Sequence, residues 1–264
     1  MSTQYESLHS PLLYPDAFHV PAPEPAVGKA VWPRQPGVFI RAVPGQGMQV
    51  PQLGQLPQLA EVDDAPVEPA ANTEALDAPD ASDAAHADQP ERTLLRRELV
   101  AGQFGLVPPW VKSASDAKLR STKMVNARSE SVTTSTNFRG AWLARQRCIV
   151  PMRAFLEDDW RSGKAVPTRI SRVDGKPMGV AGLWELWTGA DGAFISSFTL
   201  LTVNANSHAL MSRYQTPGNE KRMPAILNEG AFDAWLSARP DKAKEFMRAY
   251  PANWLTANPV ETGR

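Results

Sequence analysis

The sequence predicts an α+β fold organised around antiparallel sheet. Short apolar runs with strand character alternate with short segments of helical spacing through the second half of the chain. Asp174 and Gly175 stand between two strand-like runs, a pattern typical of a β-hairpin. The sequence shows no internal repeat. Short strands mixed with short helices, without a repeating unit, favour the α+β class.

The elements are expected in the following order. Strands are predicted at residues 38–43 and 98–107, and the helical spacing of Phe138, Trp142 and Leu143 predicts a helix over residues 137–147. A single strand over 148–156, a hairpin over 168–187 and a strand over 196–205 should follow. The chain should close with an amphipathic helix over 229–239 and a short exposed helix over 241–250.

One stretch lacks the composition of a folded element. Residues 48–91 are rich in Pro, Ala, Asp and Gln and have few large apolar side chains, so burial cannot offset the entropy of ordering them. We interpret them as a disordered surface insertion within a single domain that spans residues 1–264. We expect this insertion to contribute nothing to the folded core.

The net charge of zero hides a strong asymmetry. Ten acidic residues and no Lys or Arg lie between Glu61 and Glu91, which leaves 28 basic and 18 acidic residues elsewhere. The folded part is therefore basic, which suits a polyanionic partner. The alternative is a basic surface that serves only solubility.

Several classes of protein do not fit. The single cysteine, Cys148, excludes an intramolecular disulfide and is best interpreted as a small core residue. No apolar run reaches the ~20 residues of a membrane span, and the first residues lack the regions of a secretory signal, so we expect a cytoplasmic protein. The four histidines are scattered and no Gly-rich phosphate loop is visible, so no metal and no cofactor are expected.

Six short motifs carry most of the functional information: GQFGLVPPW at 102–110, VNARSE at 125–130, RCIVPMRAFLEDDW at 147–160, VAGLWELW at 180–187, LLTVNAN at 200–206 and KRMPAIL at 221–227. Each mixes apolar residues with polar groups at fixed offsets, as strand ends that face a shared site do. With the opening MSTQY, they resemble the SOS response-associated peptidase family, also called abasic site processing proteins. The resemblance covers residues 1–5 and most of 100–258, and it implies a barrel-like antiparallel core with flanking helices.

The first candidate for chemistry is Ser2. Removal of Met1 would leave Ser2 with a free α-amine, whose pKa near ~8 leaves a useful neutral fraction. In the family this position is a cysteine, and the resemblance implies capture of the ring-opened sugar of an abasic site in single-stranded DNA. Serine keeps the amine but gives a more easily hydrolysed ring than a thiol. The alternative is a frayed terminus without a covalent role.

Glu157 is the second candidate. Phe155, Leu156 and Trp160 around it predict a partly desolvated carboxylate at a strand end, suited to proton transfer. Its position matches the catalytic Glu of the family. The alternative is that Glu157, Asp158 and Asp159 form a solvated turn.

Asn126 and Arg128 are two residues apart and should share one face of an extended segment. Arginine suits bidentate contact with phosphate, and the resemblance assigns the pair to the active site and the DNA backbone. Alternatively, Arg128 pairs with Glu130 and Asn126 caps a helix.

Phe104 and Trp110 lie in an apolar loop beside Lys112, Lys118 and Arg120. Aromatic rings interleaved with positive charge suit single-stranded nucleic acid, because bases stack on the rings while cations follow the phosphates. The alternative for Trp110 is a place in the core.

The sequence departs from the family near its C-terminus. The family has a catalytic His shortly before Arg-Met-Pro, and here that place falls on Gln215 or on Glu220. Neither has an imidazole with a pKa near neutrality. His208 is nearby but is better interpreted as a packing or helix-capping residue. Arg222 is expected to be a phosphate ligand.

The leading function is therefore binding of single-stranded or abasic DNA by a monomer, with a weakened covalent step. The alternative is a catalytically degenerate module that binds DNA or protein, favoured by the loss of the family Cys and His. A peptidase acting on other proteins is the weakest hypothesis, because Ser2 has no visible His/Asp partner.

Overall fold

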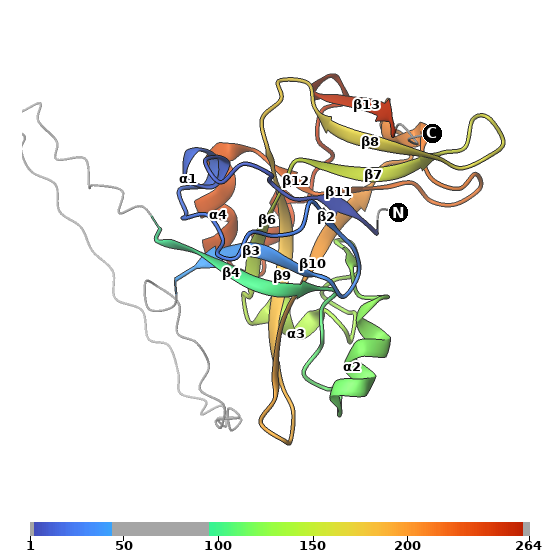
Figure 1. The fold of residues 1–264 in the computed structure, drawn as a ribbon. Coiled ribbons are helices and arrows are strands. Elements are labelled where there is room, and N and C mark those ends of the chain that lie inside the picture. Colours follow the sequence, from blue (N-terminus) through green and yellow to red (C-terminus); the bar gives the residue numbers. More distant parts are fainter. Residues whose placement is uncertain (1–2, 44–94, 261–264) are drawn as a thin grey trace, which may run out of the picture. The chain divides into compact units, whose positions relative to one another are not determined.

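Five strands pair in a closed ring that forms the centre of the molecule. They are β3 (Pro36–Ala42), β4 (Arg97–Phe104), β6 (Arg147–Met152), β9 (Met178–Thr188) and β10 (Phe194–Asn204). The order is β10-β4-β3-β6-β9, and β9 pairs again with β10, which closes the ring. Only the β10–β4 pair in the ring is parallel. The computed structural model describes residues 3–43 and 95–260 (Figure 1).

Outside the ring, the C-terminal part of β10 pairs with two further strands. β11 (Arg222–Pro224) pairs antiparallel with β10, and β5 (Asn126–Arg128) pairs parallel with it. β12 (Ile226–Leu227) pairs with β9. Strands of the ring approach one another closely at Gly182, where an added Cβ would lie 2.6 Å from the carbonyl oxygen of Thr199. The glycine is therefore required by packing at this point.

A second sheet is built from β13 (Leu255–Pro259), β8 (Val166–Arg172), β7 (Ala154–Asp159), β1 (Tyr5–Glu6) and β2 (Ala30–Val31), in that order. The chain enters this sheet from the ring at Arg153, whose backbone amide donates to the carbonyl of Glu6 at 2.8 Å. The prediction of one strand over 148–156 is therefore wrong. The apolar run continues across the break because both strands are buried.

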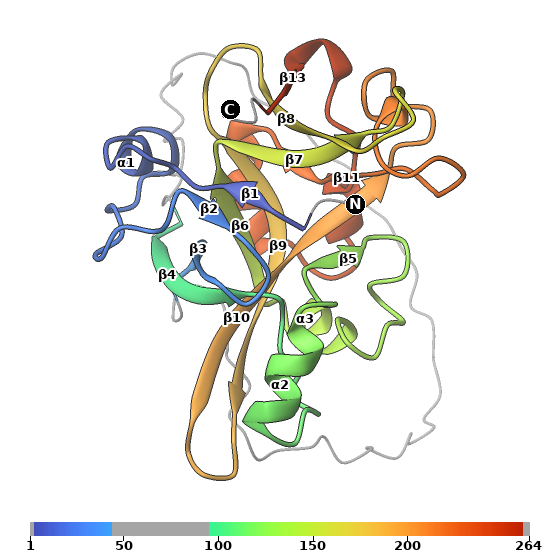
Figure 2. The ribbon, with the colours of Figure 1, turned by 45° about the vertical axis from the view of Figure 1, so that its right-hand side comes forward.

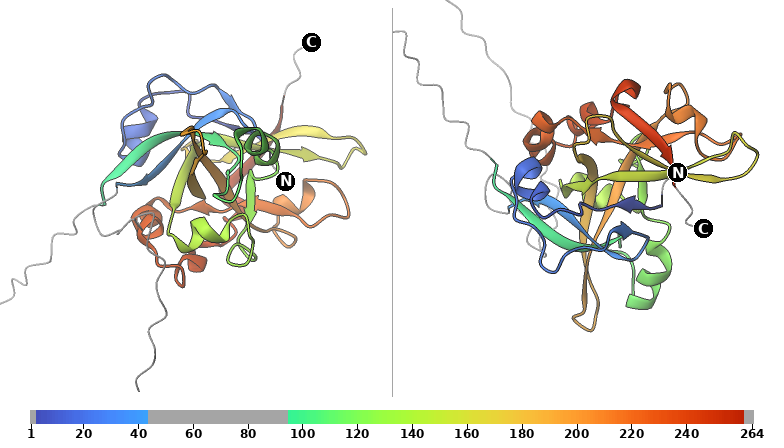
Figure 3. Two further views of the ribbon diagram at one scale, coloured as in Figure 1. Left: turned by 90° about the horizontal axis from the view of Figure 1, so that it is seen from below. Right: turned by 45° about the horizontal axis from the view of Figure 1, so that its top comes forward.

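Helices cover the outside of the sheets. α1 (Leu13–Phe18) lies against α4 (Phe232–Ser237), with the rings of Phe18 and Phe232 stacked at 5.5 Å (Figure 1). The view from below in Figure 3 shows these two helices outside the ring. α2 (Ala114–Ser121) starts at Ser113, whose Oγ accepts a hydrogen bond from the amide of Asp116. The remaining helical elements are α3 (Arg139–Leu143), η1 (Met211–Arg213), η2 (Glu229–Ala231), η3 (Ala243–Phe246) and η4 (Ala252–Trp254).

The structure confirms the predicted α+β class and the barrel-like antiparallel core, but it corrects the predicted hairpin. A turn does form at Asp174–Gly175, with Gly175 at φ 71°. However, β8 pairs with β7 and β13, whereas β9 pairs with strands of the ring. The turn therefore links two sheets, because a local turn signal does not specify the partners of its flanking strands.

Two other predictions lie outside the described residues: the acidic insertion at 48–91 and the reactive Ser2. Within the described part of the chain, no helix is long and apolar enough to cross a membrane.

Candidate functional site

The pairing of β1 with β7 brings the start of the described chain beside Glu157. Tyr5 lies opposite Phe155, and the amide of Leu156 donates to the carbonyl of Gln4 at 3.3 Å. Thr3, the residue before Gln4, lines the same cavity as Glu157. Figure 2 shows β1 alongside β7 with the chain start at its end. The residue after Ser2 is therefore a wall of this cavity.

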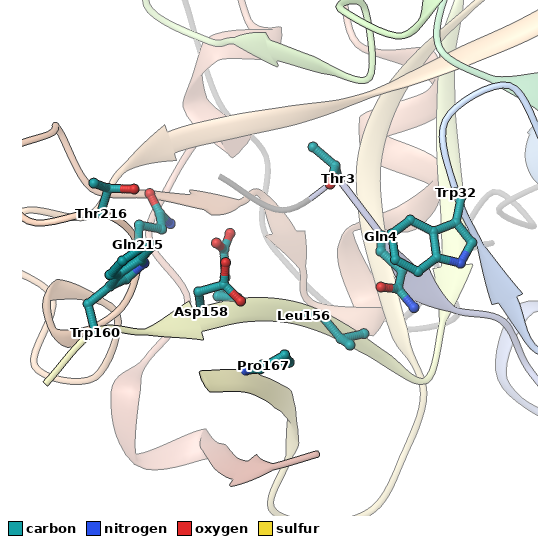
Figure 4. Close-up of a pocket in the computed structure, with 10 residues that line it drawn as sticks. Thr3, Gln4, Trp32, Leu156, Asp158, Trp160, Pro167, Gln215 and Thr216 are labelled. Carbon is teal, nitrogen blue, oxygen red and sulfur yellow. The ribbon is translucent and has the colours of Figure 1, made fainter. Parts of the chain in front are cut away.

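The cavity has a volume of about 290 Å³ and combines aromatic walls with an acidic floor. Trp32 lies on one side and Trp160 on the other, with Asp158 between them (Figure 4). Residues that precede β1, residues of β7 and β8, and the segment that follows η1 meet here. The lining residues are Thr3, Gln4, Trp32, Leu156, Glu157, Asp158, Trp160, Pro167, Gln215 and Thr216.

The three consecutive acids of β7 have different surroundings. Glu157 is only 5% exposed, which confirms the predicted desolvation. Asp158 is exposed and lines the cavity. Asp159 pairs with Arg161 at 2.6 Å, and the hydrogen bond from Arg161 lowers the pKa of Asp159. Glu157 is therefore the acid best placed for chemistry. The interpretation of the three acids as a solvated turn is wrong, because all three lie in β7 and only Asp158 is exposed.

β5 presents Asn126 and Arg128 on one face, as the two-residue spacing predicts. Ala127 between them is fully buried, whereas Asn126 is partly exposed and Arg128 is exposed. Arg128 lines a second cavity of about 260 Å³, together with Asn219, Glu220 and Arg222. Gln215 and Thr216 line both cavities, so they form a common wall between the acidic floor and Arg128.

A network of ion pairs fills one side of the second cavity. Arg222 bonds Glu130 at 2.7 Å and Glu220 at 2.8 Å, and Arg128 bonds Glu220 at 2.7 Å. Partial burial opposes ionisation of Glu130, but the hydrogen bond from Arg222 prevails and lowers its pKa. The hydrogen bonds from Arg222 and Asn204 also lower the pKa of Glu220. Both acids are therefore held in the charged form.

Arg222 does not have the surroundings predicted for it. Its side chain is 2% exposed, and it also donates to the carbonyl and hydroxyl oxygens of Thr202. The prediction that Arg222 contacts DNA phosphate is therefore corrected. Its guanidinium is buried and ion-paired with Glu130 and Glu220 inside the protein. Arg128, with 54% of its side chain exposed, keeps access to solvent despite its ion pair.

Phe104 also requires a correction. Its ring is fully buried, 5.3 Å from that of Tyr5 and 5.5 Å from that of Phe198. A ring enclosed in the core cannot stack on a base. Trp110, in contrast, is 43% exposed, and the guanidinium of Arg120 lies over it at 5.1 Å. Of the two predicted stacking residues, Trp110 has the exposed ring beside a cation that nucleic-acid contact requires, and Phe104 does not.

Gln215 takes part in a backbone-like pairing instead of acid–base chemistry. Its side-chain amide accepts from the backbone amide of Arg222 at 3.1 Å and donates to the carbonyl of the same residue. The backbone amide of Gln215 donates to the carbonyl of Asp158 at 2.8 Å, which fixes the wall between the two cavities. His208 accepts from the amides of Leu210 and Met211 through Nδ1, which confirms its predicted capping role.

Comparison with known proteins decides the family. The model of the SOS response associated peptidase (SRAP) family matches residues 49–263. The chain belongs to this family. The abasic site processing protein YoqW of Bacillus subtilis is 31% identical over 164 residues, which cover 61% of this chain and 68% of YoqW. The abasic site processing protein HMCES of Gallus gallus is 26% identical over 197 residues, 67% of this chain and 55% of HMCES.

Solved SRAP-like structures support the same assignment. A crystal structure of a Bordetella bronchiseptica protein superposes with a TM-score of 0.74 at 33% identity and covers 98% of this chain and 99% of that one. A structure from Bacteroides thetaiotaomicron gives a TM-score of 0.57 at 25% identity, over 62% of this chain and 70% of that one.

Sequence reasoning missed two features of this SRAP member. Trp32 lines the cavity, although it is distant in sequence from every motif singled out. The sequence shows only that Gln215 lacks the imidazole of the family, whereas the structure shows that its side-chain amide binds the backbone of Arg222. The only sequence signal for Trp32 was an aromatic residue directly before a proline in a polar turn.

Proposed function

We propose that this protein processes abasic sites in single-stranded DNA. The observation that carries the proposal is the cavity in which Thr3 and the buried Glu157 are neighbours, in a chain whose named relatives are abasic site processing proteins. A reactive group at residue 2 would be directly connected to that cavity. A flipped-out sugar without a base is small enough to enter a space of about 290 Å³.

The proposed covalent step is imine formation. With Met1 removed, the neutral α-amine of Ser2 attacks the C1′ aldehyde of the ring-opened sugar, forming a C–N bond and a carbinolamine. Loss of the hydroxyl as water then gives the imine, with Glu157 transferring the proton to the leaving oxygen. The Ser2 hydroxyl can add to the imine only reversibly, so the adduct hydrolyses readily.

Arg128 and Trp110 would hold the DNA outside the cavity. Arg128 is half exposed in the second cavity, which shares Gln215 and Thr216 with the acidic cavity, so a phosphate can compete with Glu220 for its guanidinium. Trp110 offers an exposed ring beside a cation. We also propose that the protein acts as a monomer in the cytoplasm.

The test is incubation with a single-stranded oligonucleotide that carries one abasic site. Borohydride should trap a protein–DNA adduct on a denaturing gel, whereas the untreated sample should show little adduct after heating. Glu157→Gln should slow trapping, and Asp158→Asn, at the exposed neighbour, should slow it less. Intact mass measurement establishes whether Met1 is removed. If Met1 is absent and nothing is trapped, the covalent function is excluded.

A second candidate function is a non-catalytic DNA-binding module of the same fold. The observation that favours it is Gln215, whose amide is engaged by the backbone of Arg222 and offers no titratable group. This alternative predicts equal affinity for abasic and intact single strands. A competition experiment between the two oligonucleotides distinguishes the candidates.

A further inference from the structure

Trp32 is a large apolar side chain left at the rim of the acidic cavity. It is 47% exposed, although tryptophan side chains are usually well buried. Figure 4 shows its ring beside Gln4, on the side of the cavity opposite Trp160. The packing of the core does not require a tryptophan in this place.

The backbone that carries Trp32 is fixed at several points. The amide of Trp32 donates to Oε1 of Gln35 at 3.2 Å, and the amide of Gln35 donates to the carbonyl of Trp32 at 3.0 Å. The amide of Arg34 donates to the carbonyl of Phe104 at 2.7 Å, which ties the turn to the end of β4. The backbone that carries the ring is therefore ordered before any ligand arrives, so binding requires little further ordering of this turn.

The charge of the cavity lining limits what can enter it. Glu157 and Asp158 both line the cavity. Their acidity disfavours a phosphate there, so the uncharged sugar is the part of the strand that fits. Trp32, with Lys29 and Arg34 exposed nearby in the sequence, offers instead an apolar ring of the kind on which bases of single strands stack.

We propose that Trp32 is a stacking platform for the base next to the abasic nucleotide, so that stacking outside the cavity positions the baseless sugar inside it. This inference rests on the proposed function and adds a specificity-determining residue to it. The ligand is a single-stranded segment with an intact base beside the lesion.

The chain offers a matched control for the test. Trp254 is also 47% exposed, but it lines a different cavity with Phe246 and Tyr250. The variants are Trp32→Ala, Trp32→Phe and Trp254→Ala. Each is measured for affinity to an oligonucleotide with one stable abasic analogue, at fixed salt, after its melting temperature has been compared with that of the wild type.

Loss of one stacked base should weaken binding about 5- to 150-fold in Trp32→Ala. Trp32→Phe should retain most of the affinity, and Trp254→Ala all of it. In a second arm, both nucleotides beside the lesion also lack their bases. The wild-type affinity should then fall to that of Trp32→Ala, which should itself change little.

The outcomes separate this inference from the function on which it rests. If the wild-type protein does not bind the oligonucleotide, the proposed function fails. If the wild type binds and Trp32→Ala binds equally well, the stacking role is overturned and the function stands. Equal losses in Trp32→Ala with and without the neighbouring bases would mean that Trp32 contacts a part of the DNA other than those bases, and would also overturn the role.

Discussion

Two arginines that look alike in the sequence have different surroundings in the fold. Arg222 is enclosed, with its guanidinium shared between Glu130, Glu220 and Thr202. Arg128 shares Glu220 with it but remains half exposed. Burial, and not residue type, therefore decides which arginine can exchange a protein carboxylate for a phosphate.

Replacing Arg128 tests that difference. Arg128→Ala should weaken single-stranded DNA binding and reduce its salt slope by about one, because one fewer counterion is released. Arg239→Ala is the control, since Arg239 is also exposed and ion-paired. The measurement is affinity over a range of salt concentrations. An unchanged slope would mean that Arg128 serves only its ion pair with Glu220.

The pairing of Glu130 and Glu220 with Arg222 makes stability depend on acidity. Both carboxyls have pKa values below the ordinary value of 4.5 in the folded protein. Their contribution is therefore complete above about pH 5 and is lost as the pH falls through the lowered pKa values. Urea unfolding between pH 3 and 7 should show a smaller acid loss for Glu130→Gln/Glu220→Gln than for the wild type. Glu245→Gln, at an exposed pair with Lys242, should behave as the wild type; an equal pH dependence in all three would contradict the assignment.

At the scale of elements, local signals identified most strands but not their partners. Residues 36–42 and 194–204 form strands as the apolar runs predict. The turn at Asp174–Gly175 also forms, yet its flanking strands belong to different sheets. Pairing depends on contacts between distant segments, such as Tyr5 opposite Phe155, which no local window contains.

The same dependence on distant contacts limited how much of the candidate site could be predicted. The motifs identified Glu157, Asn126 and Arg128, because polar residues at strand ends are visible in the sequence. Phe104 and Trp110 belong to one motif, but the first is buried and the second is 43% exposed. Only the packing of Tyr5 and Phe198 on Phe104 separates them. Trp32 reaches the cavity through the pairing of β2 with β1, which the sequence does not reveal.

At the scale of the whole molecule, the described chain leaves and re-enters the ring at adjacent points. Ala42 pairs with Arg97, and the amide of Val43 donates to the carbonyl of Arg96 at 2.9 Å. The acidic segment predicted as an insertion is thus joined to two neighbouring strand ends. A connection between such ends can vary in length at little cost, since closure entropy grows only with the logarithm of length.

Deleting residues 50–90 should therefore leave the melting temperature nearly unchanged. The deletion should tighten DNA binding at low salt, because a tethered polyanion competes with phosphates for the basic surface. Near 1 M salt, where the screening length is about 3 Å, the difference should vanish. A large drop in melting temperature would show that the segment contributes to packing, and unchanged low-salt affinity would show that its charge does not reach the DNA site.

The pairing of the strands also determines where another chain could add a strand. In the ring, β4 meets β10 only at Gln103 and Phe104, so the stretch over residues 97–102 pairs with β3 alone among the described strands and keeps an open edge. In the second sheet the outer strands are β2, with two residues, and β13, with five residues ending at Pro259. A two-residue edge and an edge that ends in proline are poor templates for edge-to-edge association, so an added strand is expected at β4 and not at the second sheet.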